Sequence, residues 1–232
     1  MSCRIALLAV VVFAISTGLG SSPSRAHHCL GGHADRPECA PPTATLGDLT
    51  CTEGQVAKFS GSAWVCTDLF APKLVFVSST PSTGNLGGFE GADDTCQDLA
   101  DAAELDGIFK AWISTTANIQ PHIFPLSRFT HSLGPYTLVD GTLVAQDFIS
   151  LTSGVISNPI DVDEKGAFVG ADFVWSSTLP EGRLNGDTCL NWTDGSSTSV
   201  ARDGRTDRAN EHWSNFGQRD CDELARIYCF EQ

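Results

Sequence analysis

The cysteines constrain this chain more than any other feature. Its 232 residues include nine of them. The first, Cys3, lies in a stretch typical of a secretory leader, with the basic residue Arg4, an apolar run over 5–15, and small and polar residues up to Ala26. Cleavage after Ala26 leaves eight cysteines. An even number in an exported chain predicts a disulfide framework.

The leader has two alternative interpretations. Cleavage after Gly20 is the second choice, and an uncleaved anchor is the third, although the apolar run is shorter than the roughly 20 residues that a membrane-spanning helix needs. Cys29 does not follow the triplet that a lipid-attachment signal requires. We expect residues 1–26 to be removed and the protein to be secreted, extracellular or at the cell surface, with the periplasm as an alternative. The mature chain is not expected to insert into a membrane.

The mature chain is strongly acidic. The whole sequence has a formal charge of −14, and the leader contributes two arginines and no acid, so that cleavage takes the charge to −16. A surface this negative repels nucleic acid and anionic lipid, and we expect neither as a partner. The charge is compatible with a cationic partner or divalent cations, and it also keeps an exported protein soluble.

Residues 27–72 form an amino-terminal stub that contains four cysteines. Within it, CTEGQVAKFSGSAWVC at 51–66 predicts a β-hairpin with its turn at Ser-Gly-Ser. Ranked by proximity, the expected disulfides are Cys51–Cys66, across the open end of the hairpin, and Cys29–Cys39. We expect the stub to act as a spacer or docking module, and any homo-oligomer to form through it.

Residues 73–232 form one stretch that is long enough to bury a core. The run LVFVSST at 74–80 predicts a strand. Apolar residues then recur with helical spacing, and a helix is expected to begin at Asp93 as N-cap and to end at Gly107. Short β-like runs follow among long loops: FKAWIST, FVWSST, TCLNW and ARIYCF. The fold class is α+β, with loops that need disulfides to hold them.

From about residue 74 to the end, this order of elements resembles the C-type-lectin-like fold, and most closely the endostatin domain of collagens XV and XVIII. A bacterial family of secreted proteins of unknown function, known from leptospiral lipoproteins, shares the likeness. The matching segments cover about two thirds of the chain: GADDTCQDLADAAELDGIFKAWIST, RFTHSLGPYTLVDGTLVA, NPIDVDEKG, VWSSTLPEGRLNGDTCLNW and the tail WSN…CDELARIYCFEQ.

The resemblance implies two further disulfides, Cys96–Cys229 and Cys189–Cys221. Loop closure supports the first pair independently. Joining Cys96 to Cys229 across 133 residues would remove unfolded-state entropy equivalent to about 5 kcal/mol. A local bond between Cys221 and Cys229 is the alternative.

Metal ligands are only weakly indicated. Lectins of this fold bind calcium with a Pro-centred triplet and a Trp-Asn-Asp triplet, whereas this chain has Trp-Ser-Asn at 213–215 and no such Pro-centred triplet near Cys189. Endostatins use amino-terminal histidines for zinc, and the matching region at 75–82 has none. We expect no cofactor. Calcium is the alternative, in the EF-hand-like loop DVDEKGAFVGAD with Asp161, Asp163 and Asp172 as ligands.

Catalytic motifs are not found. The sequence has no GxSxG, no HExxH and no phosphate-cradling glycine loop, and the thiols of the mature chain are assigned to bridges. We therefore do not expect an enzyme. A divergent hydrolase is the least favoured alternative.

The expected ligand surface is the segment NGDTCLNWTD at 185–194, together with 202–207. Its amide and carboxylate side chains suit sugar hydroxyls and its Trp offers a stacking surface: Asn185, Asp187, Asn191, Trp192 and Asp194. The structural alternative puts the Trp in the core and the Asn and Asp residues in turns. Asn191-Trp192-Thr193 is also a glycosylation sequon.

These features lead to two main hypotheses. The first is an exported, non-catalytic recognition domain that binds glycans or extracellular matrix or surface proteins through its loops. The second is a structural or assembly module of a surface appendage.

Overall fold

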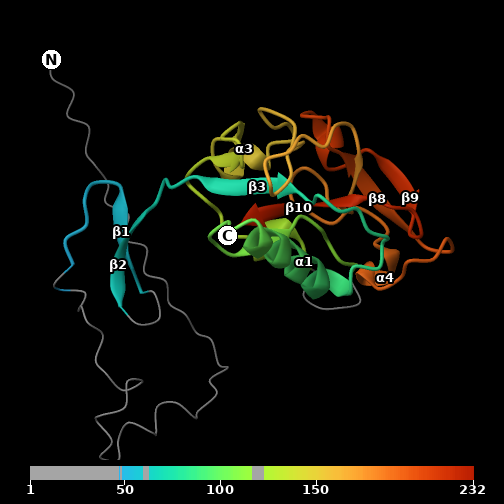
Figure 1. Cartoon of the computed structure of the whole chain (residues 1–232), viewed down its shortest axis with the longest axis horizontal. Coiled ribbons are helices and arrows are strands. Elements are labelled where there is room, and N and C mark those ends of the chain that lie inside the picture. Colours follow the sequence, from blue (N-terminus) through green and yellow to red (C-terminus); the bar gives the residue numbers. More distant parts are fainter. Residues whose placement is uncertain (1–46, 48, 60–62, 117–122) are drawn as a thin grey trace, which may run out of the picture. The chain divides into compact units, whose positions relative to one another are not determined.

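The computed structural model describes residues 47, 49–59, 63–116 and 123–232 (Figure 1). The expected leader and the expected Cys29–Cys39 bond lie outside these residues. The stub contains the predicted hairpin, a two-stranded sheet of β1 (Gln55–Phe59) and β2 (Trp64–Asp68). The predicted Cys51–Cys66 disulfide is present, with its Cα atoms 5.4 Å apart.

The rest of the described chain builds one eight-stranded sheet. Its strands are β3 (Lys73–Val77), β4 (Phe109–Ala111), β5 (Tyr136–Leu138), β6 (Leu143–Ala145), β7 (Phe173–Trp175), β8 (Val200–Arg205), β9 (Gly217–Asp220) and β10 (Arg226–Glu231). The order across the sheet is β6-β5-β3-β10-β7-β8-β9, and β4 also pairs with β10. The pairs β3–β5 and β7–β10 are parallel, and the other pairs are antiparallel.

Strand β10 lies at the centre of this sheet. Along one edge it pairs with β3, with Cys229 opposite Phe76. It also pairs with β7 through Ile227 and with β4 through Cys229. The run from Ile227 to Phe230 is buried throughout. A strand covered on both faces reads as a continuous apolar run, which explains why the sequence IYCF does not alternate.

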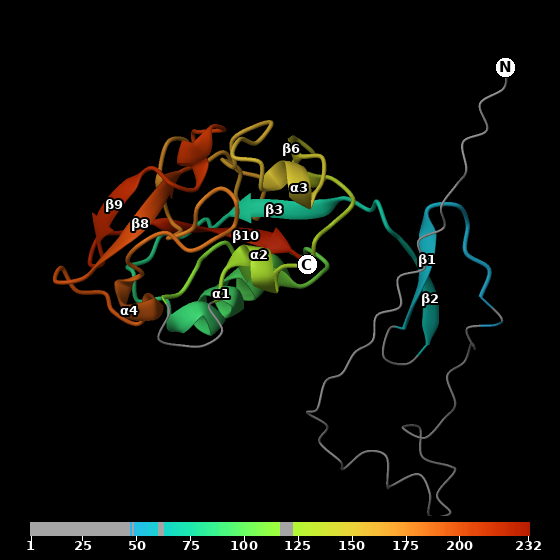
Figure 2. The same cartoon turned by 180° about the vertical axis from the view of Figure 1, so that it is seen from behind.

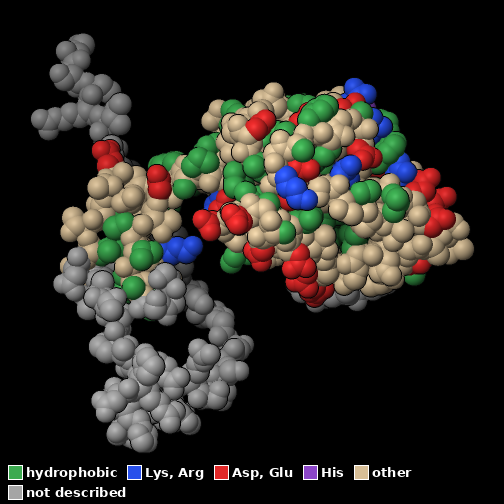
Figure 3. All heavy atoms as spheres, in the orientation of Figure 1, with side chains coloured by type: hydrophobic (Ala, Val, Ile, Leu, Met, Phe, Trp, Pro, Cys, Tyr) green, Lys and Arg blue, Asp and Glu red, His purple; other side chains and the backbone are tan. Residues whose placement is uncertain are grey.

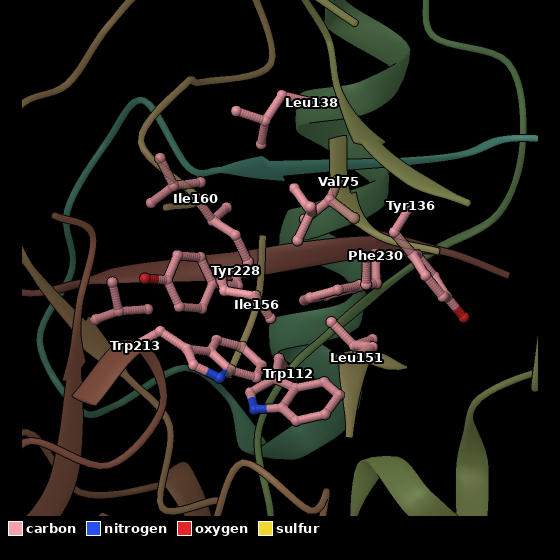
Figure 4. Close-up of a cluster of buried hydrophobic side chains, with 14 of the residues drawn as sticks. Val75, Trp112, Tyr136, Leu138, Leu151, Ile156, Ile160, Trp213, Tyr228 and Phe230 are labelled. Carbon is pink, nitrogen blue, oxygen red and sulfur yellow. The ribbon is translucent and has the colours of Figure 1, made fainter. Parts of the chain in front are cut away.

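The sheet separates two layers of core. Because side chains alternate along a strand, Tyr228 and Phe230 face one layer, and Ile227 and Cys229 face the other. The first layer contains a group of aromatic rings from different elements, among them Trp112 and Trp213 with centroids 5.0 Å apart (Figure 4). Helix α1 (Gly88–Ala102) covers the second layer.

The helices other than α1 are short: α2 (Pro125–Arg128), α3 (Phe148–Leu151), α4 (Cys189–Trp192) and the 3-10 turn η3 (Glu211–Trp213). Figures 1 and 2 show α1 and α3 on opposite sides of the strands β3 and β10, in agreement with the two core layers.

The predicted ends of α1 are wrong. The helix begins five residues before Asp93, after Gly87, whose φ of 78° turns the chain into it, and it ends before Gly107. Asp93 lies inside the helix and does not cap it. Its carboxylate accepts the backbone N–H of Ala111 at 2.8 Å and pairs with Arg128 at 2.6 Å, so it joins α1 to β4.

Both disulfides implied by the resemblance are present. Cys96 in α1 is bonded to Cys229 in β10 with Cα atoms 5.4 Å apart, and Cys189 to Cys221 with Cα atoms 5.7 Å apart. The local alternative, Cys221 with Cys229, is therefore wrong. The described part of the chain is a mixed α+β structure with three disulfides, which indicates an oxidising extracellular or periplasmic environment. Among the described helices, none has the length and apolar character to span a membrane.

Candidate functional site

Helix α4 is a left-handed turn. The backbone φ angles of its four residues are 48°, 52°, 60° and 67°, and none of the four is glycine. For L-amino acids this conformation costs roughly 1–2 kcal/mol per residue, because the Cβ approaches the following carbonyl oxygen. Strained backbone of this kind persists only where the surrounding structure imposes it, and it concentrates at functional sites.

Two polar side chains hold the middle of the turn. Thr188 caps it, since its Oγ1 accepts the backbone N–H of Asn191 at 3.1 Å. The Asn191 side chain in turn accepts two hydrogen bonds from Thr116, one from the backbone N–H at 2.7 Å and one from the hydroxyl at 2.8 Å. The turn is thereby fixed to a segment some 75 residues earlier in the chain.

Both ends of the turn are anchored in the core. Cys189 is fully buried and bonded to Cys221, and it packs so closely on Gly84 that a Cβ there would overlap its sulfur. Trp192 is fully buried, and its indole Nε1 donates to the carbonyl of Ser114 at 2.7 Å. With both ends fixed, Leu190 is held outward with 66 % of its surface exposed.

A pocket of about 260 Å³ lies beside this turn. Its lining comes from three separate segments of the chain: Thr116; Asp187, Thr188 and Leu190; and Thr198, Ser199 and Val200. Asp187 is exposed. None of the described residues forms a hydrogen bond or an ion pair with its carboxylate. Among the described residues of the lining, it is also the one ionisable residue.

Asp194 organises the wall of the pocket that precedes β8. Its carboxylate accepts the hydroxyls of Ser199 and Ser196, the latter at 3.0 Å, and the backbone N–H of Ser196 at 3.0 Å. These bonds, with that from Ser199 the largest, lower the pKa of the Asp194 carboxyl below its usual value. The hydroxyls of Ser196 and Thr198 are 2.8 Å apart. Since the hydrogen of Ser196 goes to Asp194, Thr198 donates to Ser196.

The five residues expected to bind ligand have different positions. Asp187 lines the pocket, while Asn191 and Asp194 support its walls without lining it. Trp192 lies in the core, so its ring offers no surface for stacking. The Asn185 side chain donates to Asn215 at 2.8 Å and is also absent from the lining.

Thr116 and the wall at 198–200 lie outside the expected ligand segment at 185–194, whereas Thr188 and Leu190 lie inside it but are not among the five residues expected to bind. The stretch GSSTSV carries a signal, because hydroxyl side chains next to Asp194 predict local hydrogen bonds of this kind. Thr116 could not be found from the sequence, since only the tertiary fold brings it to α4.

Two of the three aspartates in the acidic loop at 161–172 make other contacts. Asp163 accepts the backbone N–H groups of Lys165 and Ala167 at 2.9 and 2.8 Å, and Asp172 pairs with Arg226 at 2.7 Å. Burial raises the pKa of Asp161 above its usual value. Among the described residues there is no group of three or more His, Cys, Asp or Glu side chains placed to hold a metal ion.

The pocket therefore offers one unpaired carboxylate, several hydroxyl oxygens and two aliphatic side chains. Such an arrangement can bind a small polar group that donates hydrogen bonds. No protein-family model matches the chain, and no curated protein matches it either.

Proposed function

We propose that this chain is an exported, non-catalytic recognition domain, and that it binds a glycan or an extracellular protein through the pocket beside α4. The observation that carries the proposal is the left-handed turn. Four successive residues are held in a costly conformation by a disulfide, a buried indole and four hydrogen bonds. The result of that strain is an exposed Leu190 beside an open polar pocket.

The overall plan of the domain supports this proposal. Its first strand, β3, pairs with its last, β10, and Cys96–Cys229 joins α1 to that last strand. Long loops between these elements carry the pocket. The C-type-lectin-like likeness proposed for this chain has the same plan, with binding on loops around a braced scaffold. Because such scaffolds host unrelated activities, the pocket itself decides what is bound, and no bound cofactor is part of the proposal.

An array of glycans and extracellular matrix proteins, probed with and without calcium, tests the proposal. The informative variant is Leu190→Asn, since Asn adopts positive φ more readily than Leu and the fold is kept. Ile149→Asn is the control, because Ile149 is also a largely exposed aliphatic residue, at 79 % against 66 % for Leu190, and it lies on α3.

We expect at least one ligand whose binding is weakened by Leu190→Asn and unchanged by Ile149→Asn. The proposal fails if no ligand in either class binds, or if both variants bind like the wild type. Self-association through residues 27–72 without any ligand would instead favour an assembly module. Hydrolysis of array components, lost on substituting one acid, would favour an enzyme.

A further inference from the structure

We infer that the pocket beside α4 takes a protonated primary amine, namely the side chain of a lysine presented by a partner protein. This rests on the proposed function and narrows its ligand class.

Three hydroxyls of the lining have already committed their hydrogens to protein acceptors. The hydroxyl of Thr116 donates to Asn191 at 2.8 Å, and that of Ser199 donates to Asp194. The hydroxyl of Thr198 donates to that of Ser196, because the Ser196 hydrogen is already donated to Asp194. A hydroxyl has one hydrogen and two lone pairs, so these oxygens present acceptors toward a ligand. These three oxygens therefore favour a ligand that donates hydrogen bonds.

The charge of the lining has the same preference. Asp187 is exposed, its carboxylate has no partner among the described residues, and the other lining residues that the structure describes are neutral. The chain as a whole carries −14, and acidic side chains gather along α1 on the face seen in Figure 3. A cation is therefore favoured both by the net field and by a charge-assisted hydrogen bond at the site.

The size and rim of the pocket distinguish among donors. A volume of about 260 Å³ holds one side chain. Leu190 and Val200 provide apolar surface against which a methylene stem can lie while its ammonium group meets the oxygens. Lysine has a compact charge with three donors that can point to separate oxygens, whereas the planar fork of arginine needs paired acceptors. Sugar hydroxyls accept as well as donate, and the hydroxyls of Thr116, Thr198 and Ser199 give them no hydrogen to accept.

The test is a titration of the 15N-labelled protein with Nα-acetyl-L-lysine N-methylamide, followed by amide chemical shifts at about 0.15 M salt, where the Debye length is about 8 Å. The companion probes are the Nε-acetylated lysine derivative, the arginine equivalent and a panel of monosaccharides. The proteins are wild type, Asp187→Asn and the control Asp98→Asn. Asp98 is an exposed acid on α1 outside the lining, so its substitution matches the change in charge.

We expect saturable shifts at Thr116, Thr188, Leu190 and Ser199 with the lysine probe, with affinity on the order of millimolar for so small a ligand. Asp187→Asn should weaken this binding about tenfold, the effect of losing one charge-assisted hydrogen bond. Asp98→Asn should bind like wild type, and the Nε-acetylated probe should not bind.

The inference is overturned if the lysine probe leaves the pocket amides unmoved, if Asp187→Asn binds it as well as wild type, or if Nε-acetylation makes no difference. Sugars that shift the same amides while lysine does not would overturn the lysine assignment and leave the proposed recognition function standing. Failure of the recognition function itself is decided separately, by the array and its Leu190→Asn variant.

Discussion

The side-chain oxygen of Asn191 accepts both the backbone N–H and the hydroxyl of Thr116, at 2.7 and 2.8 Å. One amide oxygen therefore joins the left-handed turn to a segment that follows β4. Both residues are half-buried, so the two bonds are shielded from water in part and contribute to the stability of the turn.

Thr116→Val removes the hydroxyl bond and keeps the shape of the side chain. We expect the free energy of unfolding to fall by about 1 kcal/mol, the usual net contribution of one such bond, as measured by denaturant titration. Thr95→Val is the control, since the Thr95 hydroxyl bonds only to a carbonyl of its own helix at 2.8 Å on an exposed face. An equal loss in both variants would contradict a special role for Thr116.

Leu190→Asn should stabilise the domain. Leu190 has φ 52° and ψ 50°, and Asn tolerates this region better than Leu. The side chain is 66 % exposed, so little packing is lost. We expect the free energy of unfolding to rise by about 0.5–1 kcal/mol, within the range of such backbone effects. A fall of that size in denaturant titration would show that α4 is not strained at this position.

The two disulfides of the domain should differ in their contribution. In the loop-closure model, the Cys96–Cys229 bond across 133 residues stabilises by about 5 kcal/mol, and the Cys189–Cys221 bond across 32 residues by about 4 kcal/mol. The double substitution Cys96→Ala, Cys229→Ala should therefore lower the melting temperature further than Cys189→Ala, Cys221→Ala. If calorimetry gave the reverse order, loss of the disulfide that anchors α4 would destabilise the domain more than loss of the disulfide that closes the longer loop.

Asp203 should make stability fall as the pH rises through the acid range. It is 2 % exposed in β8, and burial raises the pKa of its carboxyl above the ordinary 3.8 despite Arg219 at 3.3 Å. A raised folded-state pKa means that ionisation costs more in the folded than in the unfolded protein, so stability is lost between the unfolded and the folded pKa.

Asp203→Asn removes this dependence. Relative to wild type, the variant should gain in free energy of unfolding as the pH rises from 3.8 toward neutrality. Denaturant titrations at a series of pH values measure the difference between the two proteins. At any single pH, the difference in free energy of unfolding also includes the loss of the contact between Asp203 and Arg219. The change of this difference with pH is therefore the quantity that tests the raised pKa. A difference that is flat or falls with pH would contradict the raised pKa.

Asp194→Asn tests the orientation of the pocket hydroxyls. An amide at this position can donate to Ser199, which would free the serine hydrogen to point into the pocket. Residue 194 does not line the pocket. We nevertheless expect the affinity for the lysine probe to fall about fivefold, which is less than the loss of one charge-assisted hydrogen bond would cause. The same amide titration measures this loss. Unchanged affinity would show that the hydroxyl directions do not select the ligand.

Much of the architecture was predictable from the sequence, but not all of it by the same route. The hairpin closed by Cys51–Cys66 follows from local alternation and turn residues. The Cys96–Cys229 pairing is implied by the resemblance and supported by loop closure, and the structure contains it. The start of α1 was misplaced because Asp93 looks like a cap, whereas its carboxylate serves a contact with β4 that no local pattern encodes.

The candidate site was harder to predict for a physical reason. Residue type alone points to Asp187 and to the neighbourhood of α4 as a candidate site. The left-handed turn was not, because Cys-Leu-Asn-Trp has no local preference for positive φ beyond its Asn. The conformation is imposed by anchors such as Ser114 and Cys221, which lie far away along the chain.

The central position of β10 has a consequence for how the domain forms during synthesis. Strands β3 and β7 flank it, yet β10 follows every other described strand along the chain. A nascent polypeptide that lacks β10 has two separate groups of strands and no strand that joins them. The apolar residues of both core layers are then exposed. Both core layers are therefore completed only when this strand has been made, and until then their apolar residues stay exposed.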